Sequence, residues 1–258
     1  MTDLPADLRP AFIDLLLAVA DDKLLLGHRD SDWTGLGPIL EEDIASSALA
    51  QDEIAHAQAI YDIVGELEGT AADALAFGRP PDAFRCAAIV ELSDEFDWAR
   101  FLARRFFCDH FDALRVQRLA ASSYTPLAQL ARRIGDEEQA HVAHVNGWIV
   151  RLGQGTAEAR QRLQAALDTL APLVATLFEP VANEAALETA GLYPPLETPM
   201  LERYRAAIEE VAARAGVRIE IPEPSDTPGG RRGHHTPQLA ELLEEMCEVY
   251  RLEPGVAW

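Results

Sequence analysis

The sequence is poor in cysteine, in long apolar runs and in signal-like segments, and each shortage excludes a class of protein. The cysteines Cys86, Cys108 and Cys247 are scattered, without the spacing of a disulfide framework or a zinc-binding motif, which favours a reducing compartment. The longest apolar stretch, residues 15–20, is too short to span a bilayer, and the N-terminus has neither a basic region nor an apolar signal core. We therefore expect a cytoplasmic protein with no membrane partner.

Basic residues are also scarce. The 22 lysines and arginines oppose 43 aspartates and glutamates, so the formal net charge is −21. Nucleic-acid binding requires a basic surface that neutralises phosphates, so we expect no nucleic-acid partner. The dense basic clusters are Arg100 with Arg104 and Arg105, and Arg231 with Arg232. We interpret each as a solvated face or an interface with an acidic partner, rather than as a ligand site.

Helix-forming residues are abundant. Apolar residues make up 48% and charged residues 25%, as in globular proteins, while β-branched runs are scarce, so we predict an all-α fold. Turn-forming segments at 30–38 and 78–81 and an N-cap at Thr156 separate the helices. The predicted helices span residues 10–28, 38–67, 94–122, 126–152, 156–178, 199–215 and 237–250. We expect residues 217–221 to be extended, and residues 222–235 to form a loop arm on the helical body or on a partner.

Two Glu-x-x-His pairs dominate the sequence: Glu53 with His56, and Glu138 with His141. Residues i and i+3 lie on one face of a helix, so each pair can present a carboxylate and an imidazole to one metal ion. Each pair lies in the second helix of a predicted hairpin, and two such hairpins form the four-helix bundle of ferritin-like di-metal proteins. We predict one ferritin-like domain, residues 1–258, with a core bundle at about 8–153, a helical extension at about 156–216, and a loop and C-terminal helix at about 217–258.

The remaining metal-facing positions should come from the first and third helices. Antiparallel helices joined by short loops place facing residues at matched depth about 30 positions apart. Counting back from Glu138 leads to Asp109, and counting back from Glu53 leads to Lys23. Asp109 is flanked by phenylalanines, so its carboxylate, if buried, needs a metal, a cation or a hydrogen-bond network to compensate it. The alternative is that Asp109 points to solvent.

Lys23 breaks the ferritin-like pattern. An ammonium group has three donors and no lone pair, so it cannot bind a metal. Three carboxylates and one ammonium balance one divalent ion instead of two. Three hypotheses stay open: the ammonium replaces a metal and the site is inert, one ion remains with Glu138, His141 and Asp109, or Lys23 is an exposed lysine unrelated to any site. The neighbouring Asp22 would need a register shift to take the place of Lys23.

Short stretches spread over the chain carry a family resemblance. They lie at residues 25–29, 32–33, 40–45, 148–156, 165–168, 177–180, 233–236, 242–246, 249–251, 254–255 and 257–258. By these stretches the chain resembles the ferritin-like subunits of the bacterial phenylacetyl-CoA epoxidase (ring 1,2-phenylacetyl-CoA monooxygenase), most closely the structural, non-catalytic subunit.

The resemblance implies a multicomponent oxygenase of phenylacetate catabolism. In that family a di-iron catalytic subunit uses oxygen and electrons from a reductase to epoxidise the aromatic ring of phenylacetyl-CoA. A homologous subunit with an eroded metal site pairs with it and supports it. By position, the ligands of the catalytic subunit match Glu53, His56, Asp109, Glu138 and His141. Lys23 falls where that subunit has a glutamate.

The preferred interpretation is a scaffolding subunit whose partner is the homologous di-iron catalytic subunit. For this chain we keep three cofactor states open, namely one iron ion, two iron ions or none, and a homo-oligomer is the alternative state of the isolated chain. The rival interpretation is an autonomous mono- or di-iron oxidase that uses the five matching ligands. A third interpretation is a ferritin-like protein that binds or stores metal.

Overall fold

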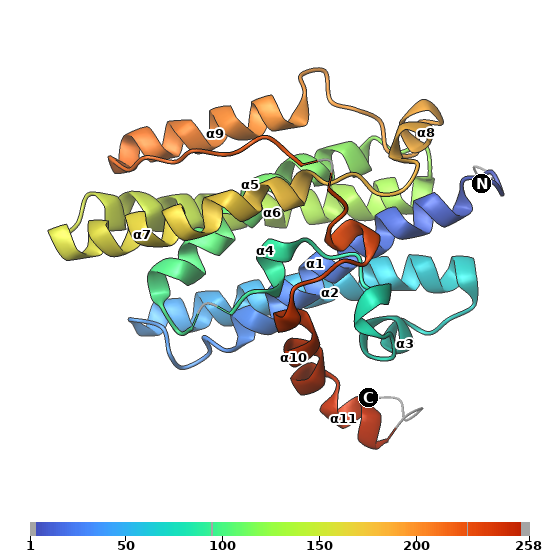
Figure 1. Cartoon of the computed structure of the whole chain (residues 1–258), viewed down its shortest axis with the longest axis horizontal. Helices are drawn as coiled ribbons and strands as arrows, with labels where there is room; N and C mark the ends of the chain where they lie inside the picture. The colour runs from blue at the N-terminus through green and yellow to red at the C-terminus, as the bar shows by residue number, and fades with distance from the viewer. Residues whose placement is uncertain (1–3, 94, 226, 254–258) are drawn as a thin grey trace. The chain divides into compact units, whose positions relative to one another are not determined.

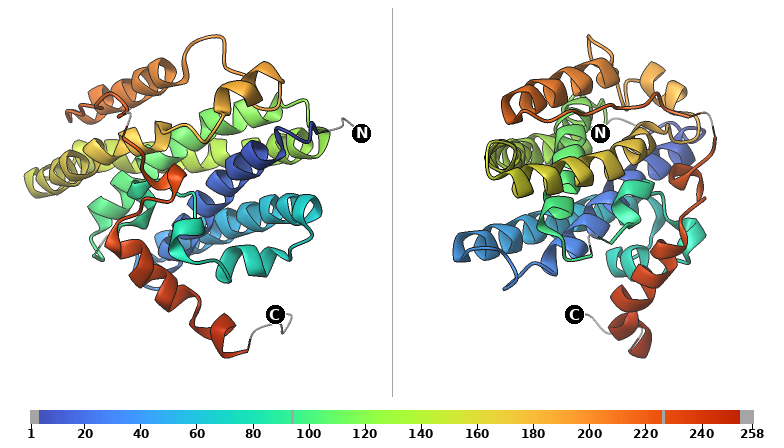
Figure 2. Two further views of the ribbon diagram at one scale, coloured as in Figure 1. Left: turned by 45° about the vertical axis from the view of Figure 1, so that its right-hand side comes forward. Right: turned by 60° about the vertical axis from the view of Figure 1, so that its left-hand side comes forward.

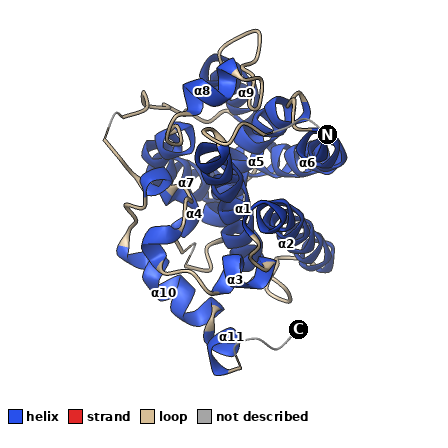
Figure 3. Ribbon diagram, turned by 90° about the vertical axis from the view of Figure 1, so that its right-hand side faces the viewer, coloured by secondary structure: helices blue, strands red, loops and turns tan. Residues whose placement is uncertain are grey.

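The computed structural model describes residues 4–93, 95–225 and 227–253 (Figure 1). Helices make up 72% of the chain, and no strand occurs within the described ranges (Figure 3). The predicted all-α class is confirmed, and this helical content agrees with a ferritin-like bundle. None of the helices in the described ranges is long and apolar enough to cross a membrane. The chain forms two compact units, so the single domain over residues 1–258 stays a prediction.

The first of these, the α1–α2 unit, comprises Arg9–Ser93, Pro180–Ala182 and Thr227–Trp258. Its two long helices, α1 (Arg9–Ser31) and α2 (Leu40–Glu68), pack side by side as a hairpin (Figure 1, Figure 2). The smaller elements of this unit are α3 (Ala72–Phe77), η1 (Pro81–Ala83), α4 (Ala88–Glu91), η3 (Gly230–Arg232), α10 (Pro237–Met246) and α11 (Glu248–Leu252). α3 packs on α2, while α10 packs on α4 and η1.

Gly27 allows α1 and α2 to approach each other closely. A Cβ atom at this position would lie 2.8 Å from the Ile54 side chain and 3.0 Å from the Ala50 carbonyl oxygen, so a larger residue would push the helices apart. Gly27 lies one turn after Lys23, and Ile54 follows Glu53. The close approach therefore fixes the register in which these two charged side chains face each other.

The other unit, the α5–α6 unit, comprises Met1–Leu8, Asp94–Glu179 and Asn183–Asp226. Its helical elements are α5 (Trp98–Ala120), α6 (Thr125–Gly153), α7 (Ala157–Val174), η2 (Ala175–Phe178), α8 (Glu184–Thr189) and α9 (Met200–Ala215). α5 and α6 form the hairpin, and both contact α7 and α9. Thr156 caps α7 as predicted, because its hydroxyl accepts the N–H of Ala159 at 3.1 Å.

The five long helices are confirmed with small shifts at their ends, whereas the short helices α3, α4 and α8 are not predicted. These three are four to six residues long, too short for a periodic pattern and dependent on tertiary contacts. The predicted C-terminal helix is interrupted at Cys247, between α10 and α11. The predicted helix start at Asp94 and the family-like stretches at 254–255 and 257–258 lie outside the described residues. α5 begins at Trp98.

The two halves of the predicted arm each lie on a helical unit. Residues 217–221 form no strand; Gln164 of α7 instead bonds the backbone N–H and C=O of Arg218, at 3.0 and 2.7 Å. On α9, Arg205 donates to the carbonyl oxygen of Ile221 at 3.0 Å. The described part of the arm after residue 226 belongs to the α1–α2 unit and contacts α1 there.

The prediction of solvated basic faces is wrong for three of the five arginines. Arg104, Arg105 and Arg231 are buried, with relative exposures of 1%, 1% and 3%. Two of them are paired with buried carboxylates, which offsets the cost of removing a guanidinium from water.

Candidate functional site

The ammonium of Lys23 binds the carboxylate of Glu53. Nζ of Lys23 lies 2.9 Å from Oε2 of Glu53, and the side chains are 0% and 1% exposed. The hypothesis of an exposed lysine is therefore wrong. The contact joins α1 to α2 across 30 residues, which is the offset expected of an antiparallel hairpin. It is a buried, charge-assisted hydrogen bond, the strong class of such contacts.

Lys23 is also the single lysine of the chain, because every other basic residue is arginine. An ammonium is a compact point charge, whereas a guanidinium is a broad planar group that binds carboxylates through two nitrogens. The positive charge beside Glu53 therefore has the compact form of a metal ion. His56, one turn after Glu53, is buried on the same helix, as the Glu-x-x-His spacing predicts.

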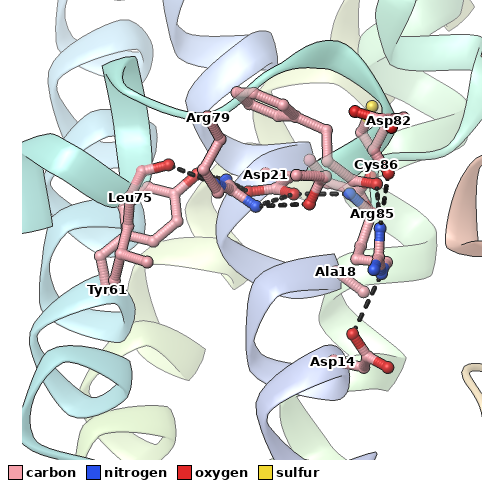
Figure 4. Close-up of polar contacts among 12 residues, drawn as sticks. Asp14, Ala18, Asp21, Tyr61, Leu75, Arg79, Asp82, Arg85 and Cys86 are labelled. Atoms are coloured by element: carbon pink, nitrogen blue, oxygen red, sulfur yellow. Dashed lines mark hydrogen bonds and ion pairs between the residues drawn. The ribbon is translucent and has the colours of Figure 1, made fainter. Parts of the chain in front are cut away.

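Asp21, next to Lys23 but one, anchors α1 to the chain that follows α2 (Figure 4). Its carboxylate accepts hydrogen bonds from the Tyr61 hydroxyl at 2.6 Å and from the Arg85 backbone N–H at 2.6 Å, and it pairs with the Arg79 guanidinium. Burial, followed by the charge of Asp21, raises the pKa of Tyr61 well above its ordinary value, so its hydroxyl stays a donor. Arg85 also pairs with Asp14 at 3.0 Å (Figure 4).

Asp22 is held by a second arginine and does not replace Lys23. Its carboxylate pairs with Arg231, with Nη2 to Oδ2 and Nη1 to Oδ1 distances of 2.7 and 2.8 Å, and it accepts the N–H of Ala87 at 2.8 Å. Arg231 belongs to the loop arm and also donates to the carbonyl oxygen of Ala18 at 3.1 Å. The arm is therefore fastened to α1 through a buried, two-point ion pair.

In the α5–α6 unit, Asp109 is buried and paired with an arginine of its own helix. Oδ1 of Asp109 lies 2.8 Å from Nη2 of Arg105, one turn earlier, and both side chains are at most 2% exposed. The alternative in which Asp109 points to solvent is wrong. Of the expected compensating groups, the structure shows a cation of the chain itself.

Glu138 and His141 lie next to each other on α6, as their spacing predicts. Oε2 of Glu138 and Nδ1 of His141 are 3.9 Å apart, and the side chains are 1% and 3% exposed. Each unit thus brings its own half of the predicted ligand set together. That both halves bind one shared metal centre stays a prediction.

Comparison with known proteins identifies the family. The sequence profile described as "Phenylacetic acid catabolic protein" matches residues 1–258. The chain belongs to this family. A relative in it, one of the subunits of the 1,2-phenylacetyl-CoA epoxidase of Escherichia coli (strain K12), is 30% identical over 244 residues, which cover 94% of this chain and 97% of the relative. The resemblance of this phenylacetic acid catabolic protein to the phenylacetyl-CoA epoxidase family is therefore confirmed.

Iron is the metal that this resemblance implies, so the donor set can be tested against it. A ferritin-like di-iron centre uses four glutamates and two histidines. Here the Lys23 ammonium binds Glu53 in one unit, and the Arg105 guanidinium binds Asp109 in the other. Two of the three candidate carboxylates are thus neutralised by cations of the chain. This set does not fit a two-iron centre, and we derive no reaction step through iron in this chain.

Several residues of these clusters are missed by sequence reasoning. Arg105 could have been found, because residues i and i+4 meet on a helix and it precedes Asp109 by four. Arg231 could not, because it meets Asp22 across 209 residues and no spacing rule links them.

Proposed function

We propose that this chain is the structural, non-catalytic subunit of a phenylacetyl-CoA epoxidase complex, where it supports a homologous di-iron catalytic subunit. The observation that carries the proposal is the Lys23–Glu53 ion pair. A lysine in place of a ligating glutamate removes one donor and ties up a second, so oxygen activation would have to occur in another subunit. The relative's description as one subunit among others of an epoxidase supports a place in such a complex.

A surface at the start of α2 supports contact with a partner subunit. Leu40 and Ile44, four residues apart on one helix face, are 70% and 63% exposed. Leu36 and Ile39, just before the helix, are 56% and 42% exposed. Exposed apolar side chains gathered in one place mark interaction surfaces. Leu40 and Ile44 also lie in the stretch 40–45, one of those that carry the family resemblance.

The test is reconstitution with the catalytic homologue encoded by the same organism. This chain and that subunit are co-expressed, the complex is isolated, and epoxidation of phenylacetyl-CoA is followed with oxygen and a reductase. We expect activity to require both subunits. We also expect Leu40→Asp with Ile44→Asp to weaken complex formation at least tenfold. Phe96→Asp, at a residue 65% exposed in the other unit, is the matched control and should leave the complex intact.

The second candidate is an autonomous iron oxidase, and the proximity of Glu138 and His141 favours it. This pair, 3.9 Å apart, keeps the donors of one mono-iron half-site. Epoxidation by this chain with a reductase, in the absence of the homologue, would establish the second candidate and overturn the scaffolding role.

A further inference from the structure

Three side chains with no part in the proposed function converge inside the α1–α2 unit: Cys86, Glu91 and His235. Sγ of Cys86 lies 3.6 Å from Nδ1 of His235 and 3.7 Å from Oε1 of Glu91, and Nδ1 lies 2.7 Å from Oε1. Cys86 and Glu91 are fully buried, and the His235 side chain is 5% exposed. A thiol, a carboxylate and an imidazole thus face one another in a nearly closed space.

The backbone around these side chains fixes their orientation. Nε2 of His235 lies 3.1 Å from the carbonyl oxygen of Phe84, to which it donates, so Nδ1 points toward Cys86 and Glu91. The second oxygen of Glu91 accepts the N–H of Thr236 at 2.7 Å. A histidine that binds a metal through one nitrogen commonly donates the other N–H to a backbone carbonyl, which sets the ring orientation. The surroundings of His235 have this form.

The distances among the three atoms suit a tetrahedral ion. With bonds of about 2.3 Å to sulfur and about 2.0 Å to nitrogen and oxygen, such an ion separates sulfur from either neighbour by roughly 3.5 Å. The measured 3.6 and 3.7 Å agree with this. Nitrogen and oxygen should lie roughly 3.3 Å apart, so only the Nδ1–Oε1 hydrogen bond has to open, by roughly 0.6 Å.

The charges also suit a divalent ion. A thiolate and a carboxylate carry two negative charges, and a neutral imidazole adds none, so one divalent cation would leave the buried cluster neutral. Sulfur and imidazole ligands with one carboxylate are the donor set of zinc and related borderline-soft ions, not of magnesium or calcium. The nearby Asp21 and Asp22 are already paired with arginines.

We propose that Cys86, Glu91 and His235 bind one divalent cation of the zinc class, with water as the fourth ligand. The ion enters as two protons leave, one from the thiol and one held between Nδ1 and Oε1. It fastens the loop arm of His235 to the segment of Cys86 and Glu91. The two segments already touch: a Cβ on Gly230 would lie 1.9 Å from the carbonyl oxygen of Cys86, and Arg231 donates to that of Arg85 at 2.7 Å.

The test is a Co²⁺ titration of the full, untagged chain after removal of bound metal, followed by Zn²⁺ competition and zinc analysis. Co²⁺ bound to a thiolate gives a near-ultraviolet charge-transfer band, which other sites without sulfur cannot give. We expect one such band, saturating at one ion per chain and abolished by Zn²⁺. His235→Gln and Glu91→Gln should weaken binding at least tenfold, and Cys86→Ser should remove the band.

The controls are a neighbouring histidine and another buried thiol. His234→Gln and Cys247→Ala should keep both the band and the affinity. Circular dichroism verifies that each variant is folded, and the histidine and glutamate variants keep the test decisive if Cys86→Ser fails to fold. Absence of a thiolate band in the wild-type chain, or a band unchanged by His235→Gln, overturns the proposal. The outcome is independent of the proposed function, because neither Lys23 nor a partner subunit takes part.

Discussion

The two Glu-x-x-His hairpins carry the same motif but neutralise their buried carboxylates in different ways. In the α1–α2 hairpin, the motif glutamate itself, Glu53, is bound by Lys23 from the other helix. In the α5–α6 hairpin, Glu138 lies beside His141, and the cation binds the accessory carboxylate Asp109 from within the same helix. A cation delivered across helices consumes a motif ligand, whereas one delivered along a helix does not. The first hairpin is therefore the more completely converted from metal binding to an ion pair.

The largest effect should come from removing the ammonium of the first hairpin. Lys23→Met leaves the Glu53 carboxylate buried without this cation, and breaking a buried pair costs about 3–5 kcal/mol of unfolding free energy. The double variant Lys23→Met with Glu53→Gln removes both charges and should recover most of the loss. Urea unfolding of both variants measures the difference.

The matched control for that loss is an exposed ion pair. Arg162 and Glu158 on α7 lie 3.5 Å apart but are 66% and 78% exposed, so Arg162→Met should change stability by less than about 1 kcal/mol. A loss from Lys23→Met as small as that of the control would mean that the Lys23–Glu53 pair is not the buried contact described above.

In the second hairpin, Arg105→Met should cost about 3 kcal/mol, at the lower end of the range for a buried pair. The two residues share one helix, so methionine keeps the helix propensity and the packing of the arginine stem. Urea unfolding again measures the loss, with Asp109→Asn in the same background as its partner variant. If Arg105→Met matched the wild type, the ion pair within α5 would not be what compensates Asp109.

The sequence predicts the two hairpins and the charged residues that face each other in the first. The Lys23–Glu53 contact follows from hairpin geometry alone, because a short turn between antiparallel helices fixes which residues lie opposite. Asp109 is found by the same count, but its cation is not predicted, although the i, i+4 spacing of Arg105 was visible. Local rules therefore recover contacts within one helix or one hairpin.

Contacts made by the loop arm could not be predicted in this way. Arg231 meets Asp22 and His235 meets Glu91 only after the chain has passed through the other unit. The scattered spacing of Cys86 excludes a sequence-local metal motif but says nothing of a cluster assembled from distant segments. The short helices α3, α4 and α8 escape for a related reason, since tertiary packing and not periodicity forms them.

A smaller effect is expected from pH, and each hairpin unit has one histidine that contributes to it. Burial lowers the pKa of His110, although a hydrogen bond to Asn146 at 2.8 Å acts in the opposite direction. Burial likewise lowers the pKa of His28 in the α1–α2 unit. The unfolded chain then binds protons that the folded chain refuses, so stability falls as the pH drops below about 6.5, by at most about 1.4 kcal/mol per pH unit for each histidine.

Variants at the two histidines check this sign. Unfolding free energies at neutral and mildly acidic pH should show a shallower pH dependence for His110→Gln and for His28→Gln than for the wild type. A pH dependence identical in the wild type and in both variants would show that neither histidine is held in its neutral form by burial.

The smallest expected effect is a reaction that does not occur. Because Lys23 is the single lysine, an amine-reactive ester has only its ε-amine and the α-amino group to label. The folded chain should take up label at the α-amino group alone, and the urea-unfolded chain should take up label at both. Labelling of Lys23 in the folded chain, located by peptide mass spectrometry, would show that α1 and α2 open at this ion pair.

The central claim, that the Lys23 ammonium stands where a metal would otherwise bind, is tested most directly by iron content. Iron per chain is measured after anaerobic ferrous loading, with Lys23 and in the Lys23→Glu variant, both in a Cys86→Ser background that removes the thiolate cluster. We predict near-zero iron with Lys23 in place and a clear rise in Lys23→Glu, since that change adds a donor and releases Glu53. One or two iron ions per chain with Lys23 intact, or no rise in the variant, would contradict the claim.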